Sequence, residues 1–246
     1  MNPYYPFKIL IKYATKGRPE RFFGGMDSIY NLCEMPEHLR VLVTADIDDP
    51  DMFNDMVKER VEKYKNAKII YGTSKGKINA INRDMDILPN GFEDWDILVN
   101  FSDDQRFVMP RWDMYLRVHF NSLAPDMDGY LSFLDPDTKG ALTTTAIIGR
   151  KYYERFGFIY DPIFDSLFCD NMADDAAKAL GKYHFIALEL IHHYNPSYGY
   201  KDFLPDQMYI DQQKIGWTKD KETYYRLKAE GIVNYLLKFE KNEKTI

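Results

Sequence analysis

The chain has 246 residues, of which 45% are hydrophobic and 28% charged, and its formal net charge is −6. This is enough chain for one large α/β domain or two small ones, and no basic face is visible of the kind that non-specific nucleic-acid binding needs. No apolar run approaches the ~20 residues of a membrane-spanning helix. The two cysteines are too few for a disulfide framework, and residues 1–6 lack a basic, apolar leader, so we expect a cytoplasmic protein.

In the first hundred residues, predicted strands alternate with predicted helices. Strands are expected at 7–13, 41–45, 68–71 and 96–101, and helices at 21–33, 52–64 and 78–85. The last of these strands contains an apolar run without polar alternation, which is typical of a strand buried on both faces. Such alternation predicts a parallel α/β sheet.

Each of these four strands leads into polar side chains. In chain order they are Thr15 and Arg18, Asp46 and Asp48, Lys77 and Asn82, and Asp103 and Asp104. Ligands of open α/β sheets bind at the carboxyl ends of the strands, so we expect these groups to converge. Two adjacent carboxylates repel each other unless a cation lies between them, and the last pair therefore predicts a divalent metal beside a phosphate ligand. Taken alone, the pair could also be an acidic turn.

The second half is expected to contain helices at 111–123, within 149–157 and at 176–180, and strands at 129–134, 142–148 and 183–191. The last strand leads into His192 and His193. A helical finish is predicted at 224–239. We find no internal repeat and no low-complexity linker, so one continuous domain is expected.

The order of these motifs over residues 7–199 resembles that of GT-A-fold glycosyltransferases, nearest to the family-2 type. The most specific match is the Gly-Lys-Ile-Asn-Ala-Ile-Asn segment at 76–82. Thr15, the Arg18-Pro19 pair and Asp46 match the ends of the family's first two strands. The family's DxD metal motif corresponds to Ser102-Asp103-Asp104, where serine replaces the first aspartate.

The resemblance implies a single GT-A (Rossmann-like) α/β domain over 1–246, with a mixed, mostly parallel central sheet flanked by helices. Residues 1–108 would form the nucleotide-sugar-binding half, 109–199 the acceptor and catalytic half, and 200–246 a C-terminal helical extension. The donor-binding residues it implies are Thr15, Arg18, Asp46, Lys77, Asn82 and Asp103.

The activity implied is metal-dependent, inverting transfer of a sugar from a nucleoside-diphosphate sugar, with a UDP-sugar first and a GDP-sugar as alternative, to a hydroxyl of a glycan or another acceptor. Asp104 with His192 or His193 would hold Mn²⁺, which imidazole favours over Mg²⁺. Asp170 would be the base that deprotonates the acceptor, and Asp174 is its competitor.

We expect Asp170 on a loop just before a helix, whose N-terminus would keep its pKa low. The alternative for Asp170 is a helix N-cap without a catalytic role.

Two other activities stay open from the sequence. A nucleotidyltransferase on a similar fold usually carries a glycine-rich segment after the first strand, and here that segment has only Gly17. A non-catalytic binder of nucleotide sugars is kept open by Ser102 in place of the first aspartate.

Overall fold

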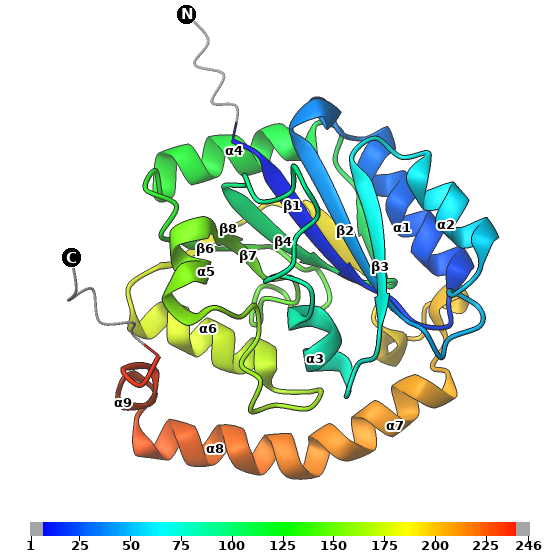
Figure 1. Cartoon of the computed structure of the whole chain (residues 1–246). Coiled ribbons are helices and arrows are strands. Elements are labelled where there is room, and N and C mark those ends of the chain that lie inside the picture. Colours follow the sequence, from blue (N-terminus) through cyan, green and yellow to red (C-terminus); the bar gives the residue numbers. More distant parts are fainter. Residues whose placement is uncertain (1–6, 240–246) are drawn as a thin grey trace, which may run out of the picture.

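The apolar strands predicted from the sequence form the centre of the molecule. In the computed structural model, which describes residues 7–239, seven strands form one sheet in the order β3-β2-β1-β4-β7-β6-β8 (Figure 1). Their bounds are β1 Ile9–Ala14, β2 Leu39–Asp46, β3 Ala67–Gly72, β4 Ile97–Phe101, β6 Tyr130–Phe133, β7 Ile147–Gly149 and β8 Tyr183–Ile186. Strand β7 is antiparallel to both of its neighbours and the other pairs are parallel, so the predicted mixed, mostly parallel sheet is confirmed.

Helices cover both faces of this sheet. Their bounds are α1 Pro19–Asn31, α2 Asp55–Glu62, α3 Lys77–Asn82, α4 Trp112–Leu123, α5 Arg150–Phe156, α6 Cys169–Ala179, α7 Gln207–Ile215, α8 Lys221–Glu230 and α9 Ile232–Leu236. One core cluster joins odd-numbered residues of β1 to α1, α2 and α4, and the other joins Leu10, Leu42 and Leu98 to α3, α5 and α6. Successive strand residues point to opposite faces, which is why both faces are apolar.

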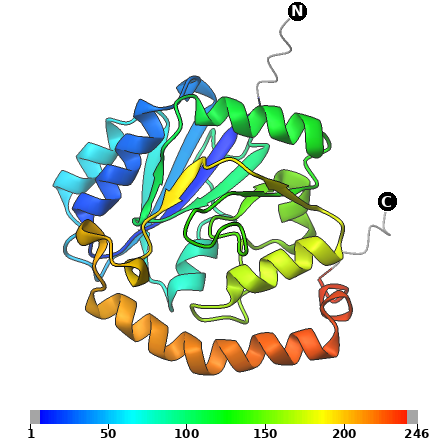
Figure 2. The ribbon, with the colours of Figure 1, turned by 180° about the vertical axis from the view of Figure 1, so that it is seen from behind.

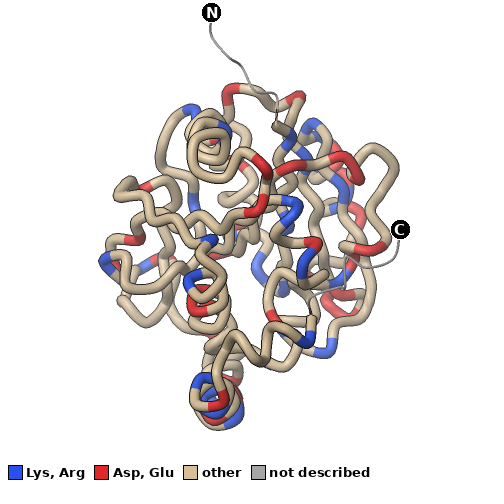
Figure 3. Tube along the Cα trace, turned by 90° about the vertical axis from the view of Figure 1, so that its left-hand side faces the viewer, with Lys and Arg blue, Asp and Glu red and all other residues tan. Residues whose placement is uncertain are grey.

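The chain ends in a curved run of helices below the sheet (Figures 1 and 2). We call residues 207–230, which comprise α7, the π-helical turn Gly216–Asp220 and α8, the C-terminal strap. Basic and acidic residues are interspersed over the side of the molecule drawn in Figure 3. No helix within residues 7–239 is both long and apolar enough to cross a membrane. Residues 1–6 and 240–246 of the predicted domain lie outside the described residues.

Several predicted boundaries were wrong. Only Ile147 and Ile148 of the predicted strand 142–148 are β-structure, as part of β7, because Thr143 and Thr144 bond instead to the side chains of Asp174 and Asp135. The predicted strand 183–191 divides into β8 and a separate strand β9, Ile191–His193.

The helical parts also differ. Helix α6 begins at Cys169, so Asp170 lies in its first turn and not before it. The predicted helical finish at 224–239 begins earlier, at Gln207, where the side chain of Asp206 accepts a hydrogen bond from the Tyr209 N–H (2.9 Å) and caps α7.

Lys12 is fully buried in the middle of β1. Its ammonium donates to Thr44 Oγ1 and to the carbonyl of Ala80 (3.3 Å), and Thr44 donates in turn to Asp84 (2.6 Å). Burial lowers the pKa of Lys12 to about 7, although Asp84 opposes the shift. The folded chain therefore holds a lysine that gives up its proton near neutrality.

We expect this lysine to make stability depend on pH. Its pKa is about 7 when folded and 10.5 otherwise, so between these values the unfolded chain binds a proton that the folded chain lacks, and stability rises with pH. The expected slope is up to about 1.4 kcal/mol per pH unit. Urea unfolding at pH 7, 8 and 9 measures it. Lys12→Met should lose this contribution and Lys68→Met, at an exposed position of β3, should keep it; equal slopes in both variants would contradict the assignment.

Candidate functional site

A cavity of about 430 Å³ opens at the carboxyl ends of β1, β2 and β4. Its other walls come from α3, the start of α6 and the inner side of α7. Among its lining residues are the predicted Thr15, Arg18, Asp46, Lys77, Asp103, Asp104, Asp170 and His193. The structure thus brings together side chains that are as far as 178 positions apart, from Thr15 to His193 (193 − 15).

Asp46 lies at the β2 end of this cavity and is 7% exposed. Its carboxylate accepts from Lys16 Nζ (3.1 Å) and from Arg83 Nη1 (3.3 Å). Burial alone would raise the pKa of Asp46, but the Ser74 hydroxyl and these two cations lower it below its usual value. Asp46 is therefore an ionised hydrogen-bond acceptor at neutral pH. Lys16 and Arg83 were missed in the sequence, although Lys16 directly follows Thr15.

The acidic pair after β4 has two different environments. Asp103 accepts from Thr15 Oγ1 (3.2 Å), and its Oδ1 is buried without a hydrogen-bond partner among residues 7–239. Burial raises the pKa of Asp103 to about 7, against the influence of Arg18. Asp104 accepts from Ser102 Oγ (2.5 Å) and lies 3.3 Å from His193 Nε2. Burial alone would raise the pKa of Asp104, but His193 and Ser102 hold it well below its usual range.

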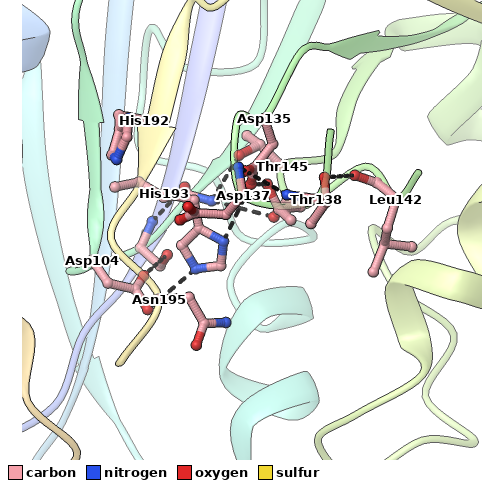
Figure 4. Close-up of polar contacts among 12 residues, drawn as sticks. Asp104, Asp135, Asp137, Thr138, Leu142, Thr145, His192, His193 and Asn195 are labelled. Carbon is pink, nitrogen blue, oxygen red and sulfur yellow. Dashed lines mark hydrogen bonds and ion pairs between the residues drawn. The ribbon is translucent and has the colours of Figure 1, made fainter. Parts of the chain in front are cut away.

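His193 joins Asp104 to a second carboxylate (Figure 4). Its Nδ1 lies 3.8 Å from Asp135 Oδ2, and Asp135 is held in turn by Thr144 Oγ1 (2.7 Å). Burial alone would lower the pKa of His193, but Asp104 and Asp135 raise it above its usual value. The imidazole thus lies between two carboxylates that favour its protonated form when no cation is bound.

A small second sheet delivers His193 to this place. Strand β5, Gln105–Phe107, pairs antiparallel with β9, with Gln105 opposite His193, and the Tyr194 N–H donates to the carbonyl of Asp104 (2.7 Å). Strand alternation then points His192 the other way, to Glu189 (2.6 Å) and Tyr200 (3.0 Å). Of the two predicted histidines, only His193 lines the cavity.

Arg18 and Lys77 add positive charge to the cavity wall. Arg18 makes a bidentate ion pair with Asp206, with Nε–Oδ2 at 2.6 Å and Nη2–Oδ1 at 2.8 Å, and so attaches the start of the C-terminal strap to that of α1. Lys77 is the first residue of α3 and favours the ionised forms of Asp104 and Asp170. The strap wall itself, which includes Tyr209 and Gln212, was not predicted.

The two candidates for the base lie in different places. Asp170 lines the cavity, whereas Asp174, one turn later, is buried and accepts from the Thr143 N–H (3.2 Å). Burial raises the pKa of Asp170, with Lys77 opposing the shift, so the expected lowering by the helix N-terminus was wrong. Burial outweighs a helix-end effect of a few tenths to ~1 kcal/mol.

Asn82 lies outside the cavity and shapes its wall. Its amide donates to the carbonyl of Tyr160 (2.6 Å) and accepts from the N–H groups of Ile159 and Tyr160 (2.8 and 3.2 Å). Tyr160 lines the cavity. The side chain therefore positions a wall residue.

The cavity wall offers a small set of donor atoms to a metal ion. Within residues 7–239, no three His, Cys, Asp or Glu side chains gather in a metal-binding arrangement. Asp104 and His193 provide an oxygen and a nitrogen at the cavity wall, and Asp103 has an unpartnered oxygen. This donor set fits a divalent ion that takes its remaining ligands from a phosphate-bearing molecule.

The chain resembles known proteins in its structure but not in its sequence. No protein-family model and no curated protein sequence matches the chain. Among solved structures, the chain is similar to the mannosyltransferase PcManGT from Pyrobaculum calidifontis in complex with GDP-Man and Mn²⁺ (TM-score 0.63, 18% identity, covering 80% of this chain and 60% of that chain).

Two further structures are similar. One is residues 1–349 of TarS from S. aureus in complex with UDP (TM-score 0.58, 11% identity, 75% of this chain and 60% of that chain). The other is glucosyl-3-phosphoglycerate synthase from Mycobacterium tuberculosis in complex with Mg²⁺ and UDP (TM-score 0.53, 14% identity, 77% and 72%). The chain thus spans 60% of the length of the first two. These likenesses, together with the sheet order, show that the chain has the GT-A fold.

Proposed function

We propose that the protein is a glycosyltransferase that moves a sugar from a nucleoside-diphosphate sugar to an acceptor hydroxyl. The observation that carries this proposal is a single cavity that holds an ionised acceptor, Asp46, the Asp104–His193 pair and the half-buried carboxyl group of Asp170. The similar structure of PcManGT is a complex with GDP-Man, a sugar nucleotide, which supports the same ligand class.

The donor would lie along the carboxyl edge of the sheet. Asp46 accepts hydrogen bonds from the ribose or base, and Thr15, Arg18, Lys77 and Asp103 surround the diphosphate. The sequence halves keep their proposed roles: residues 1–108 bind the donor, 109–199 the acceptor, and 200–246 form the extension. The acceptor is a glycan or another hydroxyl-bearing molecule. Both cysteines, Cys33 and Cys169, are free, which suits a cytoplasmic protein.

Asp104 and His193 would hold a divalent ion, Mn²⁺ in preference to Mg²⁺ because imidazole is a ligand. When bound, this ion would neutralise charge on the leaving diphosphate. Ser102, at the position of the first DxD aspartate, donates a hydrogen bond to Asp104 through its hydroxyl. It would therefore orient a metal ligand without binding the metal itself. His193 is aligned by Asp135 on its other ring nitrogen.

Asp170 would take the proton of the acceptor hydroxyl as that oxygen attacks the anomeric carbon, with inversion. A pKa raised by burial makes its carboxylate a stronger base than an exposed aspartate, and Lys77 helps to keep it ionised.

A non-catalytic nucleotide-sugar binder is the second candidate, and it is favoured by Ser102 at the position of the first DxD aspartate. It predicts donor binding without turnover, which separates it from the transferase.

Asp46→Ala should weaken binding of the nucleoside diphosphate by about 1–3 kcal/mol, the value of a hydrogen bond to a charged group. Isothermal titration calorimetry with UDP and GDP measures it. The matched control is Asp48→Ala, because Asp48 also contacts Lys16 (3.3 Å) but is exposed. The affinity of this variant for the nucleoside diphosphate should stay near that of the wild type. Unchanged affinity in Asp46→Ala would move the nucleotide site elsewhere.

Mn²⁺ should tighten nucleotide binding in the wild type but not in Asp104→Asn, because that variant loses an anionic ligand. The same titrations are run with Mn²⁺ and with EDTA. Asp137→Asn is the control, since Asp137 bonds to Tyr200 (2.9 Å) and does not line the cavity. If EDTA leaves both binding and turnover of the wild type intact, the metal proposal fails.

Asp170→Asn should lose transfer while keeping donor affinity, because the donor does not need the base. General-base catalysis contributes about 10²–10⁴-fold, so release of nucleoside diphosphate should slow by that order. Asp175→Asn, whose side chain faces Tyr224 and Lys228, is the control. Normal turnover in Asp170→Asn would assign the base to another residue, and a collapse of donor binding would make Asp170 structural.

A further inference from the structure

Three neutral polar atoms in the cavity wall, Ser74 Oγ, Asn100 Oδ1 and Ser166 Oγ, are buried and have no hydrogen-bond partner among residues 7–239. Ser74 as a whole is only half-buried and lies beside Asp46. Asn100 and Ser166 are 7% and 3% exposed. An unsatisfied buried polar group costs about 1–3 kcal/mol, so such groups are uncommon and require an explanation. Since both residues line the cavity, a ligand that reaches them would supply the missing bonds.

The backbone of Ser166 is fixed from the strap. The Asp220 carboxylate, which is fully buried, accepts from the N–H groups of Asp165 (3.0 Å), Ser166 (2.8 Å) and Leu167 (2.8 Å). The hydroxyl of Ser166 is therefore held in place by main-chain bonds while making none itself. A preorganised group of this kind binds a ligand at a lower entropic cost.

Asn100 is held in a similar way on the sheet. It lies in β4 opposite Lys12 of β1, and it faces α3 and α6 as Leu98 does. Its side chain hydrogen bonds to the Tyr160 hydroxyl, and the Lys12 ammonium bonds to Thr44 and Ala80 instead. The amide oxygen is left without a partner in the cavity wall, and an amide oxygen can only accept.

The order of the strands places these two atoms relative to a donor. Asp46 is the last residue of β2 and Asp104 follows β4, with β1 between these strands. Tyr160, the partner of Asn100, lines the cavity together with Cys169 and Asp170 from the first turn of α6. In a nucleoside-diphosphate sugar the diphosphate joins the nucleoside to the sugar. If the nucleoside lies at Asp46, the sugar reaches the end with Asn100.

We propose that Asn100 and Ser166 form the subsite for the donor sugar and select a neutral, hydroxyl-bearing sugar. This inference rests on the proposed glycosyltransferase function. One sugar hydroxyl donates to Asn100 Oδ1, and another exchanges a hydrogen bond with Ser166 Oγ. A uronic acid is disfavoured because its carboxylate would face Asp170 at this end of the cavity.

Calorimetry with paired ligands tests the subsite: UDP against UDP-glucose, and GDP against GDP-mannose. Ser166→Ala and Asn100→Leu should each lower the affinity for the sugar nucleotide about 3- to 10-fold, the equivalent of one hydrogen bond, and leave that for the diphosphate unchanged. Ser166→Thr keeps a hydroxyl and should retain most of the affinity. Ser74→Ala is the matched control, because the Ser74 hydroxyl lies beside Asp46 and its loss should weaken both ligands equally.

The outcomes separate the two levels of the proposal. A wild-type protein that binds none of the four ligands overturns the glycosyltransferase function and the subsite together. The subsite alone is overturned if the wild type binds nucleotides but Ser166→Ala lowers the affinities for sugar nucleotide and diphosphate equally. It is also overturned if Ser166→Ala lowers neither affinity. UDP-glucuronate should bind no more tightly than UDP, and tighter binding would contradict selection of a neutral sugar.

Discussion

The antiparallel pairing of β5 with β9 is the constraint on which the site depends. It sets Gln105 opposite His193 and ties Tyr194 to the carbonyl of Asp104, and this register alone brings the imidazole to the acidic turn after β4. A shift by one residue would present His192 instead, because successive side chains of a strand face opposite ways. The three-residue strand therefore determines which histidine lines the cavity beside Asp104.

Charge balance is the second constraint on the cavity. Buried carboxylates are unfavourable unless cations or hydrogen-bond donors compensate them. Asp46 has Lys16 and Arg83, and Asp104 has His193, so both stay ionised. Asp103 and Asp170 are less well compensated, and burial raises their pKa values. The cavity thus separates carboxylates whose charge is held by nearby cations from Asp103 and Asp170, in which burial favours the protonated form, and acid–base chemistry uses such a difference between carboxyl groups.

Local sequence contains the information for the strands and their ends, because an apolar run followed by a polar residue is visible without knowing the partner. This is why Thr15, Asp46 and Asp104 could be placed. The pairing of β5 with β9 could not, since three residues carry almost no periodicity. A strand is predicted at 142–148, yet Thr143 and Thr144 bond to the carboxylates of Asp174 and Asp135, which lie outside that segment. Asp220 acts on Ser166 across 54 positions, which no local pattern predicts.

The C-terminal strap is fixed at both of its ends to elements that line the cavity. Asp206 attaches it to Arg18 at the start of α1, and Asp220 attaches it to residues 165–167 before α6. Between these two attachments, α7 forms a wall of the cavity with Tyr209 and Gln212. Movement of the strap would therefore alter Arg18 near the acidic pair and Ser166 at the far end at the same time. The strap couples the two ends of the cavity mechanically, and a donor that contacts both would in turn stabilise the strap in its observed place.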